Sequence, residues 1–260
     1  MYKGLLLFLF LQSSLLAQNL VKNGFFEERE QSKPIHKPLK EVSGPIVDGW
    51  YAIDGSTPDY FNSYKSTYRG YPIIRSIERG GKIGIAMYNT QNKAEGIYTK
   101  LKTPLVKGQT YKINFTVAHC QYADFAVRQF PFLLTKEKVN PKDIKNNSSI
   151  ELQVIKLDKH VIYTDKWVQL SGIYTAKGGE EYLTIMNTRF RFTEKKHISR
   201  ILYKDASKTL NREMDRVAYY FFDNIEVLPV NESANYCQTV NYSNPKKKAK
   251  IITSKPQKKD

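Results

Sequence analysis

Two acidic residues far apart in the chain have the chemistry to hold a metal ion. The stretch 219–227 alternates like a β-strand, which places Asp223 on the same face as Phe221 and Ile225. A carboxylate among apolar side chains is costly unless a cation or hydrogen-bond donors compensate it. Glu27 lies near the start of the chain. If the first and last strands meet, Glu27 and Asp223 could share one metal ion.

A second group of side chains has the types found in sugar-binding sites. Its members are Trp50, Tyr51, Asp59, Tyr60, Phe61 and Asn62. The aromatic members could stack on the C–H faces of pyranose rings, while the acid and the amide could hydrogen-bond sugar hydroxyls. The same residues could instead pack the core or fold a loop. The sequence leaves both interpretations open.

Catalysis finds little support in the sequence. The histidines are His36, His119, His160 and His197, and none has HxxH or HExxH spacing. Neither a GxSxG elbow nor a glycine-rich phosphate loop occurs. His119 and Cys120 are neighbours in a predicted strand, so their side chains should point to opposite faces. We expect a binding protein and not an enzyme, with a degenerate hydrolase as the remaining alternative.

Short strands separated by turns must position these side chains. After a first strand near residue 20 and a short one at 49–51, the predicted strands are 84–88, 96–101, 110–119, 150–155, 167–174, 182–186 and 219–227. Residues 29–47, 140–149 and 193–216 read as polar loops. No βαβ rhythm is present, so the pattern predicts an all-β, antiparallel sandwich.

The charge of the chain indicates the kind of partner. Its net charge is +16 and its pI is near 9.6, while 41% of its residues are hydrophobic. Such a basic chain is suited to an anionic polymer or surface, although simple solubility explains the charge equally well. Residues 246–260 hold seven Lys and one Asp and no aromatic residue. We expect this tail, within residues 233–260, to be disordered.

The two ends of the chain also suggest where the protein acts. Residues 1–17 read as a secretory signal peptide, with a lysine, an apolar run and a plausible cleavage end. We therefore expect an exported protein without a transmembrane segment, in the periplasm, on the cell surface or outside the cell. The folded domain should then be 18–232. Cys120 and Cys237 could form a disulfide there or remain unpaired.

Several motifs together resemble a known family. They are the opening NLVKNGFFEE at 19–28, GWY at 49–51, TPDYFN at 57–62, AEGIY at 94–98, LKTPLVKGQTY at 101–111, AKGGEEYLTI at 176–185 and the closing FFDNIEV at 221–227. In this order they resemble the galactose-binding-like jelly rolls, which include many carbohydrate-binding modules. The resemblance extends to the jelly-roll module of bacterial envelope proteins that often precedes an OmpA-type domain. Here a lysine-rich segment, residues 246–260, follows the resembling stretch.

This resemblance implies a fold and a function. It implies a jelly-roll sandwich in which Glu27 and Asp223 are acidic ligands of a structural calcium ion, an ion that prefers six to eight oxygens. The alternative is that both are ordinary carboxylates bonded to backbone donors. It also implies a non-catalytic module of the bacterial cell envelope that binds a glycan or an anionic cell-wall polymer, with no nucleic-acid partner. The alternative function is a structural or adhesion subunit that contacts other envelope proteins and has no sugar site.

Overall fold

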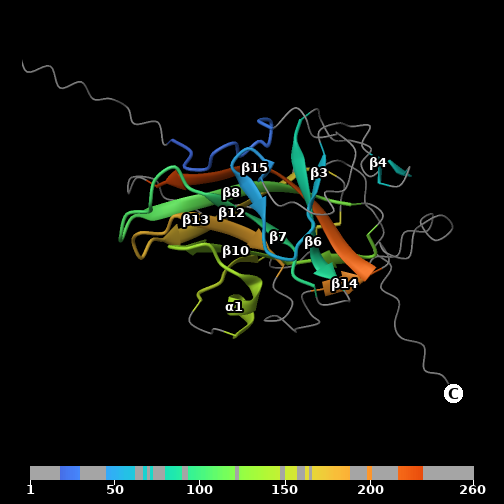
Figure 1. Cartoon of the computed structure of the whole chain (residues 1–260). Coiled ribbons are helices and arrows are strands. Elements are labelled where there is room, and N and C mark those ends of the chain that lie inside the picture. The colour runs from blue at the N-terminus through green and yellow to red at the C-terminus, as the bar shows by residue number, and fades with distance from the viewer. Residues whose placement is uncertain are drawn as a thin grey trace, which may run out of the picture.

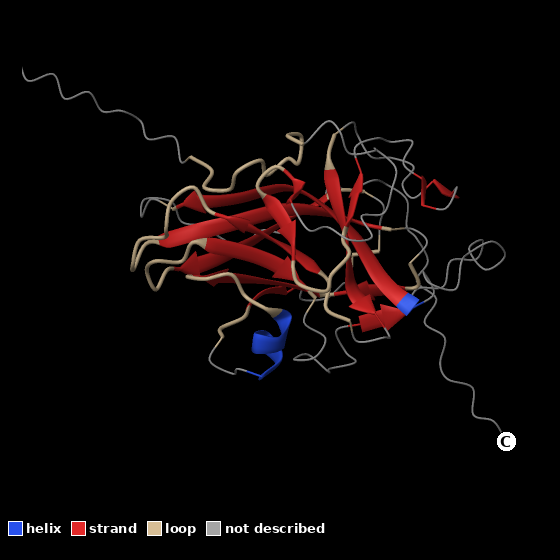
Figure 2. Ribbon diagram, in the orientation of Figure 1, coloured by secondary structure: helices blue, strands red, loops and turns tan. Residues whose placement is uncertain are grey.

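Antiparallel sheets make up most of the described structure, a computed structural model of the chain (Figures 1 and 2). It describes residues 18–29, 45–61, 67–68, 71–72, 80–89, 93–120, 123–146, 150–156, 162–163, 166–187, 198–200 and 216–230. The predicted signal peptide, Asn62, Cys237 and the predicted tail lie outside these residues. Within the described part, the strands form a six-stranded sheet, a five-stranded sheet and two small two-stranded sheets.

The described strands of each sheet come from distant parts of the chain. The six-stranded sheet has the order β1 (Pro45–Val47), β2 (Trp50–Ala52), β7 (Gly96–Lys100), β13 (Tyr182–Met186), β10 (Gln129–Thr135) and β11 (Gln153–Lys156). The five-stranded sheet has the order β12 (Val168–Thr175), β8 (Thr110–His119), β15 (Val217–Pro229), β6 (Lys82–Asn89) and β3 (Asp59–Phe61). The small sheets pair β14 (Ile198–Arg200) with β9 (Phe125–Val127), and β4 (Thr67–Tyr68) with β5 (Tyr71–Pro72).

The two large sheets pack face to face around the main core. Figure 1 shows them as stacked layers, with the short helix α1 (Pro141–Asn146) beside the six-stranded sheet. Phe115 and Phe222 from the five-stranded sheet and Phe130 from the six-stranded sheet meet between the layers, with ring centroids 5.6 to 6.4 Å apart. Aromatic contacts of this kind add to the free energy of apolar burial. The predicted all-β antiparallel sandwich is confirmed.

Strand β15 is the long, central strand of the five-stranded sheet. It pairs with β6 on one side and with β8 on the other. The register against β8 shifts between Asp223 and Glu226, and Asn224 has a left-handed backbone with φ of 51°. Because this bulge interrupts the alternation, Ile225 lies in the main core and not on the face of Asp223. The prediction that both share one face is therefore wrong.

The N-terminal segment lies against the last strand, which meets the condition set above for a site shared by Glu27 and Asp223. The Leu20 amide donates to the Val227 carbonyl over 3.0 Å, and the Ile225 amide donates to the Gly24 carbonyl over 2.9 Å. The approach is close at Gly24, where an added Cβ would lie 2.1 Å from the Ile225 carbonyl oxygen. Residues 18–29 form turns and extended chain, however, and not the predicted first strand.

Several segments differ from the sequence prediction. Strands β1 and β14 lie within the predicted loops 29–47 and 193–216. Strand β10 was not predicted, and within it Pro131 pairs with Val154 of β11. The first turns of the polar segment 140–149 form α1, where Asn140 Oδ1 accepts a hydrogen bond from the Lys142 amide at 2.9 Å. An asparagine at this position caps the unpaired amides of a helix start.

Candidate functional site

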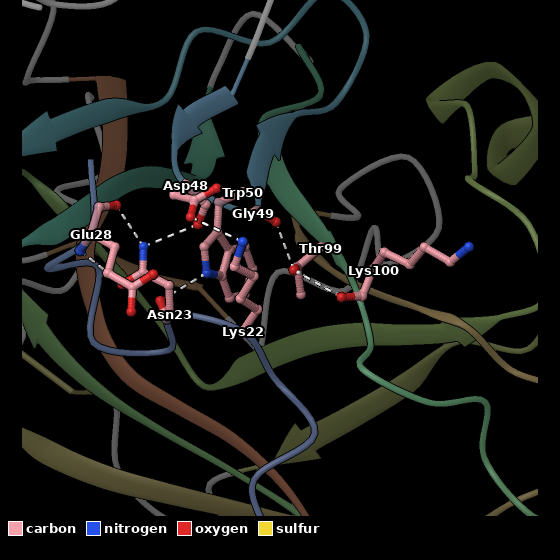
Figure 3. Close-up of polar contacts among 8 residues, drawn as sticks. All are labelled: Lys22, Asn23, Glu28, Asp48, Gly49, Trp50, Thr99 and Lys100. Carbon is pink, nitrogen blue, oxygen red and sulfur yellow. Dashed lines mark hydrogen bonds and ion pairs between the residues drawn. The ribbon is translucent and has the colours of Figure 1, made fainter. Parts of the chain in front are cut away.

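Trp50 holds the N-terminal segment against the sandwich and has no exposed surface. Its side chain is 0% exposed and packs on Phe26, with ring centroids 5.1 Å apart. Its indole Nε1–H donates to the Asn23 backbone carbonyl over 3.1 Å. The side-chain amide of Asn23, through Nδ2, in turn donates to the Asp48 backbone carbonyl over 3.0 Å (Figure 3). A sugar cannot stack on a ring that is enclosed in this way. For Trp50 the geometry supports the packing interpretation.

The next predicted contacts, Asp59 and Tyr60, are also engaged within the fold. The Tyr60 hydroxyl donates to the Phe26 carbonyl over 2.9 Å, and its ring packs against the main core. Oδ2 of Asp59 accepts a hydrogen bond from the Tyr219 hydroxyl. Burial raises the pKa of Asp59 to about 6, and the bond from Tyr219 opposes this rise. These side chains join β3 to its neighbours, whereas Tyr51 lies elsewhere.

Tyr51 belongs to a group of three tyrosines on the outer face of the six-stranded sheet. Tyr51, Tyr98 and Tyr182 come from the adjacent strands β2, β7 and β13, and we call them the tyrosine row. Tyr51 and Tyr98 are direct partners in the register and stack with ring centroids 5.3 Å apart. Tyr182 follows with its centroid 6.4 Å from that of Tyr98. Tyr51 is 36% exposed, and the other two are half-buried.

Charged and polar side chains surround the tyrosine row. The Lys138 ammonium lies 5.0 Å from the centre of the Tyr98 ring, and the Lys100 ammonium lies 5.8 Å from the centre of the Tyr182 ring. Lys138 pairs with Asp54 at 2.9 Å, and Lys100 pairs with Glu181 at 2.9 Å. The Asn140 amide also donates to Asp54, over 3.1 Å. Hydrogen-bond donors and acceptors therefore lie together beside exposed aromatic surface.

Helix α1 and the turns beside it cover another part of the same outer face. A second apolar cluster, made of Ile53, Leu133, Val139, Ile144 and Met186, packs there, and Tyr98 lies at its border. Packing against this cluster restricts the motion of the Tyr98 side chain. The tyrosine row is thus a partly exposed aromatic surface on a rigid strand scaffold, which favours recognition because little conformational entropy is lost on binding.

Glu27 and Asp223, the predicted metal ligands, influence each other: burial raises the pKa of Asp223 to about 7, and the charge of Glu27 raises it further. Oε1 of Glu27 accepts from the Gly81 amide at 2.9 Å, and Oδ1 of Asp223 accepts from the Asn224 amide at 2.6 Å. Lys82 is 1% exposed and lies in the field of both carboxylates. Among the described residues, no three Asp, Glu, His or Cys side chains gather closely enough to hold a metal ion.

These residues can be tested for their fit to calcium. One feature is compatible with the ion: Oδ1 of Asn224 is buried and has no hydrogen-bond partner in the described part of the chain. The enclosed ammonium group of Lys82 does not fit, because it would oppose a divalent cation at close range. Calcium at Glu27 and Asp223 stays a prediction that no described feature tests directly.

A second pair of carboxyl groups lies near Tyr219. The pKa of Glu95 is raised to about 8, chiefly by burial, and Asp59 raises it further, while a hydrogen bond from the Ala86 amide lowers it. Burial also disfavours the charged form of His119, and so lowers the pKa of this imidazole to about 4. Its ring nitrogen Nε2 lies 2.8 Å from the Phe125 carbonyl oxygen. These groups are enclosed within the packing, and Tyr219 itself is only 7% exposed.

Comparison with known proteins gives similarity in structure alone. No protein-family model matches the chain, and no curated protein matches it. A CBM22-1 xylan-binding domain from Paenibacillus barcinonensis is 14% identical with a TM-score of 0.41, over 82% of this chain and 96% of that domain. A cleaved adhesin domain of Lys-gingipain from Porphyromonas gingivalis is 14% identical with a TM-score of 0.38, over 72% of this chain and 94% of that domain.

An enzyme structure is also similar to this chain. An arabinose-bound α-L-arabinofuranosidase has a TM-score of 0.45 at 11% identity, over 82% of this chain but only 26% of the enzyme. The similar structures thus include carbohydrate-binding modules, at low identity and with TM-scores below 0.5. No association with an OmpA-type domain is shown. We base the function on the geometry of this chain alone.

Proposed function

We propose that the protein is a non-catalytic glycan-binding module and that the tyrosine row is its binding surface. The observation that carries this proposal is the alignment of Tyr51, Tyr98 and Tyr182 across three neighbouring strands, with part of their surface exposed. Aromatic side chains of this kind supply C–H contacts to pyranose rings while losing little conformational freedom.

The polar surroundings of the row are suited to sugar hydroxyls. A hydroxyl is both a donor and an acceptor, so it bonds best where both kinds of group are present. The Lys138–Asp54 pair, with Asn140 beside it, offers both kinds at one side of Tyr98. The Lys100–Glu181 pair offers both beside Tyr182. The recognised ligand would then be a glycan with several free hydroxyls, bound along the row.

The same proposal includes the place of action. The signal-like segment 1–17 supports export, and the net charge of +16 supports a location near an anionic cell-wall polymer. Among the described residues, no helix has the length and apolar character that a membrane span requires. The module would therefore act at the bacterial cell envelope, with a glycan as its specific ligand and the basic charge as a general attraction.

A panel of soluble glycans tests this function. Wild-type protein, Tyr51→Ala and Tyr98→Ala would be titrated by calorimetry against xylan, cellulose and peptidoglycan fragments. Ile173→Ala is the control, since Ile173 is 38% exposed but lies on β12 of the other sheet. We expect saturable binding that both tyrosine variants weaken and the control keeps. Absence of binding to every glycan would favour a protein-contacting adhesion subunit, and equal binding by all variants would place the glycan site away from the tyrosine row.

A further inference from the structure

We propose that the ammonium group of Lys82 is the resident cation of the Glu27–Asp223 site, in the place that a divalent metal ion would otherwise take. The chain would then tie its N-terminal segment to its last strand with a cation of its own. This inference is independent of glycan binding, because the tyrosine row lies on the other sheet.

Strand register brings Lys82 next to Asp223. Ile83 on β6 is paired with Phe222 on β15, and both side chains lie in the main core. The residues one step further, Lys82 and Asp223, therefore both belong to the opposite face of the sheet. Lys82 is 1% exposed and is among the largest fully buried side chains of the described residues. A buried lysine of this kind needs anionic partners.

Glu27 approaches the same place from the N-terminal segment. Its Oε1 accepts from the Gly81 amide at 2.9 Å, directly before Lys82 in the chain. A Cβ added to Gly80 would lie 2.5 Å from the same oxygen, so the Glu27 carboxylate packs tightly on this turn. Burial lowers the pKa of Lys82 to about 8, and the fields of Asp223 and Glu27 both oppose that change. Both carboxylates thus favour the charged form of this lysine.

The Lys82 ammonium group has N–H donors that make no hydrogen bond within the described part of the chain. Its one hydrogen bond within the described part of the chain goes to the Gly80 carbonyl, over a long 3.4 Å. Lysine carries three N–H donors. Each carboxylate also has a second oxygen that accepts hydrogen bonds. The remaining donors of Lys82 are therefore open to the carboxylates of Asp223 and Glu27, whose charges already act on this lysine.

Metal titration of the wild-type protein is the first test. We expect the melting midpoint to be the same in calcium and in excess chelator, and Tb³⁺ luminescence to show no saturable site. A midpoint that falls on chelation, or saturable Tb³⁺ binding that calcium displaces, would overturn the proposal in favour of a metal site.

Removal of the lysine charge is the second test. Lys82→Met should lower the melting midpoint by roughly 2–8 °C, because it leaves the half-buried carboxylate of Asp223 and the exposed carboxylate of Glu27 without their cation. The double variant Lys82→Met with Asp223→Asn should recover much of this loss, since it removes one of the unpaired charges as well. Recovery in the double variant distinguishes lost charge pairing from lost packing. A Lys82→Met protein as stable as wild type, or no recovery in the double variant, would contradict the proposal.

Discussion

Tyr51 lies directly opposite Tyr98 in the register of β2 and β7, and their rings stack at an interplanar angle of 21°. This pair makes Tyr98 the centre of the tyrosine row, because Tyr98 also contacts Tyr182 and lies under the Lys138 ammonium. Tyr51, in contrast, has a single aromatic neighbour among the described ring contacts. The two tyrosines should therefore contribute unequally to binding.

Tyr98→Ala should weaken glycan binding more than Tyr51→Ala. Loss of the central ring removes its own contact and frees both Tyr51 and Lys138 to move, so we expect at least a tenfold rise in Kd, about 1.4 kcal/mol or more. Tyr51→Ala should cost less than this. Calorimetric titration of a binding glycan compares the variants, and their melting curves control for misfolding. A larger effect of Tyr51→Ala would contradict the central position of Tyr98.

Salt should separate specific recognition from general attraction. At about 0.5 M salt the screening length falls to a few ångströms, so the net charge of +16 no longer attracts distant anions. We expect affinity for a neutral glycan to stay within about twofold, while retention on an anionic cell-wall polymer falls strongly. Parallel titrations at low and high salt measure this. Equal loss of both would mean that charge, and not the tyrosine row, controls binding.

Glu95 should make the fold less stable as pH rises. Its pKa is about 8 in the folded protein against an ordinary 4.5, so the folded state keeps a proton that the unfolded state releases. The stabilising effect is complete below about pH 4.5 and is lost as pH rises through 8, on the order of a few kcal/mol. Glu95→Gln keeps the side chain neutral and should lessen the fall of the urea midpoint between pH 6 and 8. Asp223, whose pKa burial raises to about 7, should cause part of the remaining fall.

Glu151→Gln is the matched control for this experiment. Glu151 is an exposed carboxylate paired with Lys177, so the same chemical change at that position should leave the slope between pH 6 and 8 unaltered. Asp59, with a pKa of about 6, loses its effect mostly below this window. An unchanged slope in Glu95→Gln would show that Glu95 does not carry the proton.

Asn224 should respond to substitution through its backbone. With φ of 51°, it occupies the left-handed region that asparagine and glycine tolerate and β-branched residues avoid. Asn224→Gly should therefore be neutral or slightly stabilising, whereas Asn224→Val should cost about 1–3 kcal/mol. Gln169→Val, an exposed change within β12, is the control. Chemical denaturation measures the differences, and equal stability of the two Asn224 variants would contradict the bulge.

Local patterns predicted most of the fold. Strands β8 and β13 have the bounds expected from alternation and turn residues, because their side chains face the core with a period of two. The bulge at Asn224 could not be foreseen in the same way. It depends on how β15 fits against β8 and the Gly24 turn, contacts that a single sequence does not display.

The candidate site was only partly predictable for the same reason. Tyr51 was identified from its residue type, but Trp50 next to it necessarily points to the opposite side of β2. Tyr98 alternates with the buried Ile97 and Thr99, so its partial exposure could have been predicted from the sequence. Its position beside Tyr51 and Tyr182 was not, because strand order depends on the whole topology. Lys82 was missed because a lysine in a short strand ordinarily reaches solvent.

The central place of β15 determines when the fold can form. Its partners β6 and β8 lie far upstream, yet each keeps an unpaired edge until residues 217–229 have been synthesised. Contacts of such long sequence separation slow folding and leave strand edges open to other chains. For the export proposed above, this delay would be an advantage, because a protein that cannot complete its central sheet early stays unfolded long enough to pass through a translocation channel.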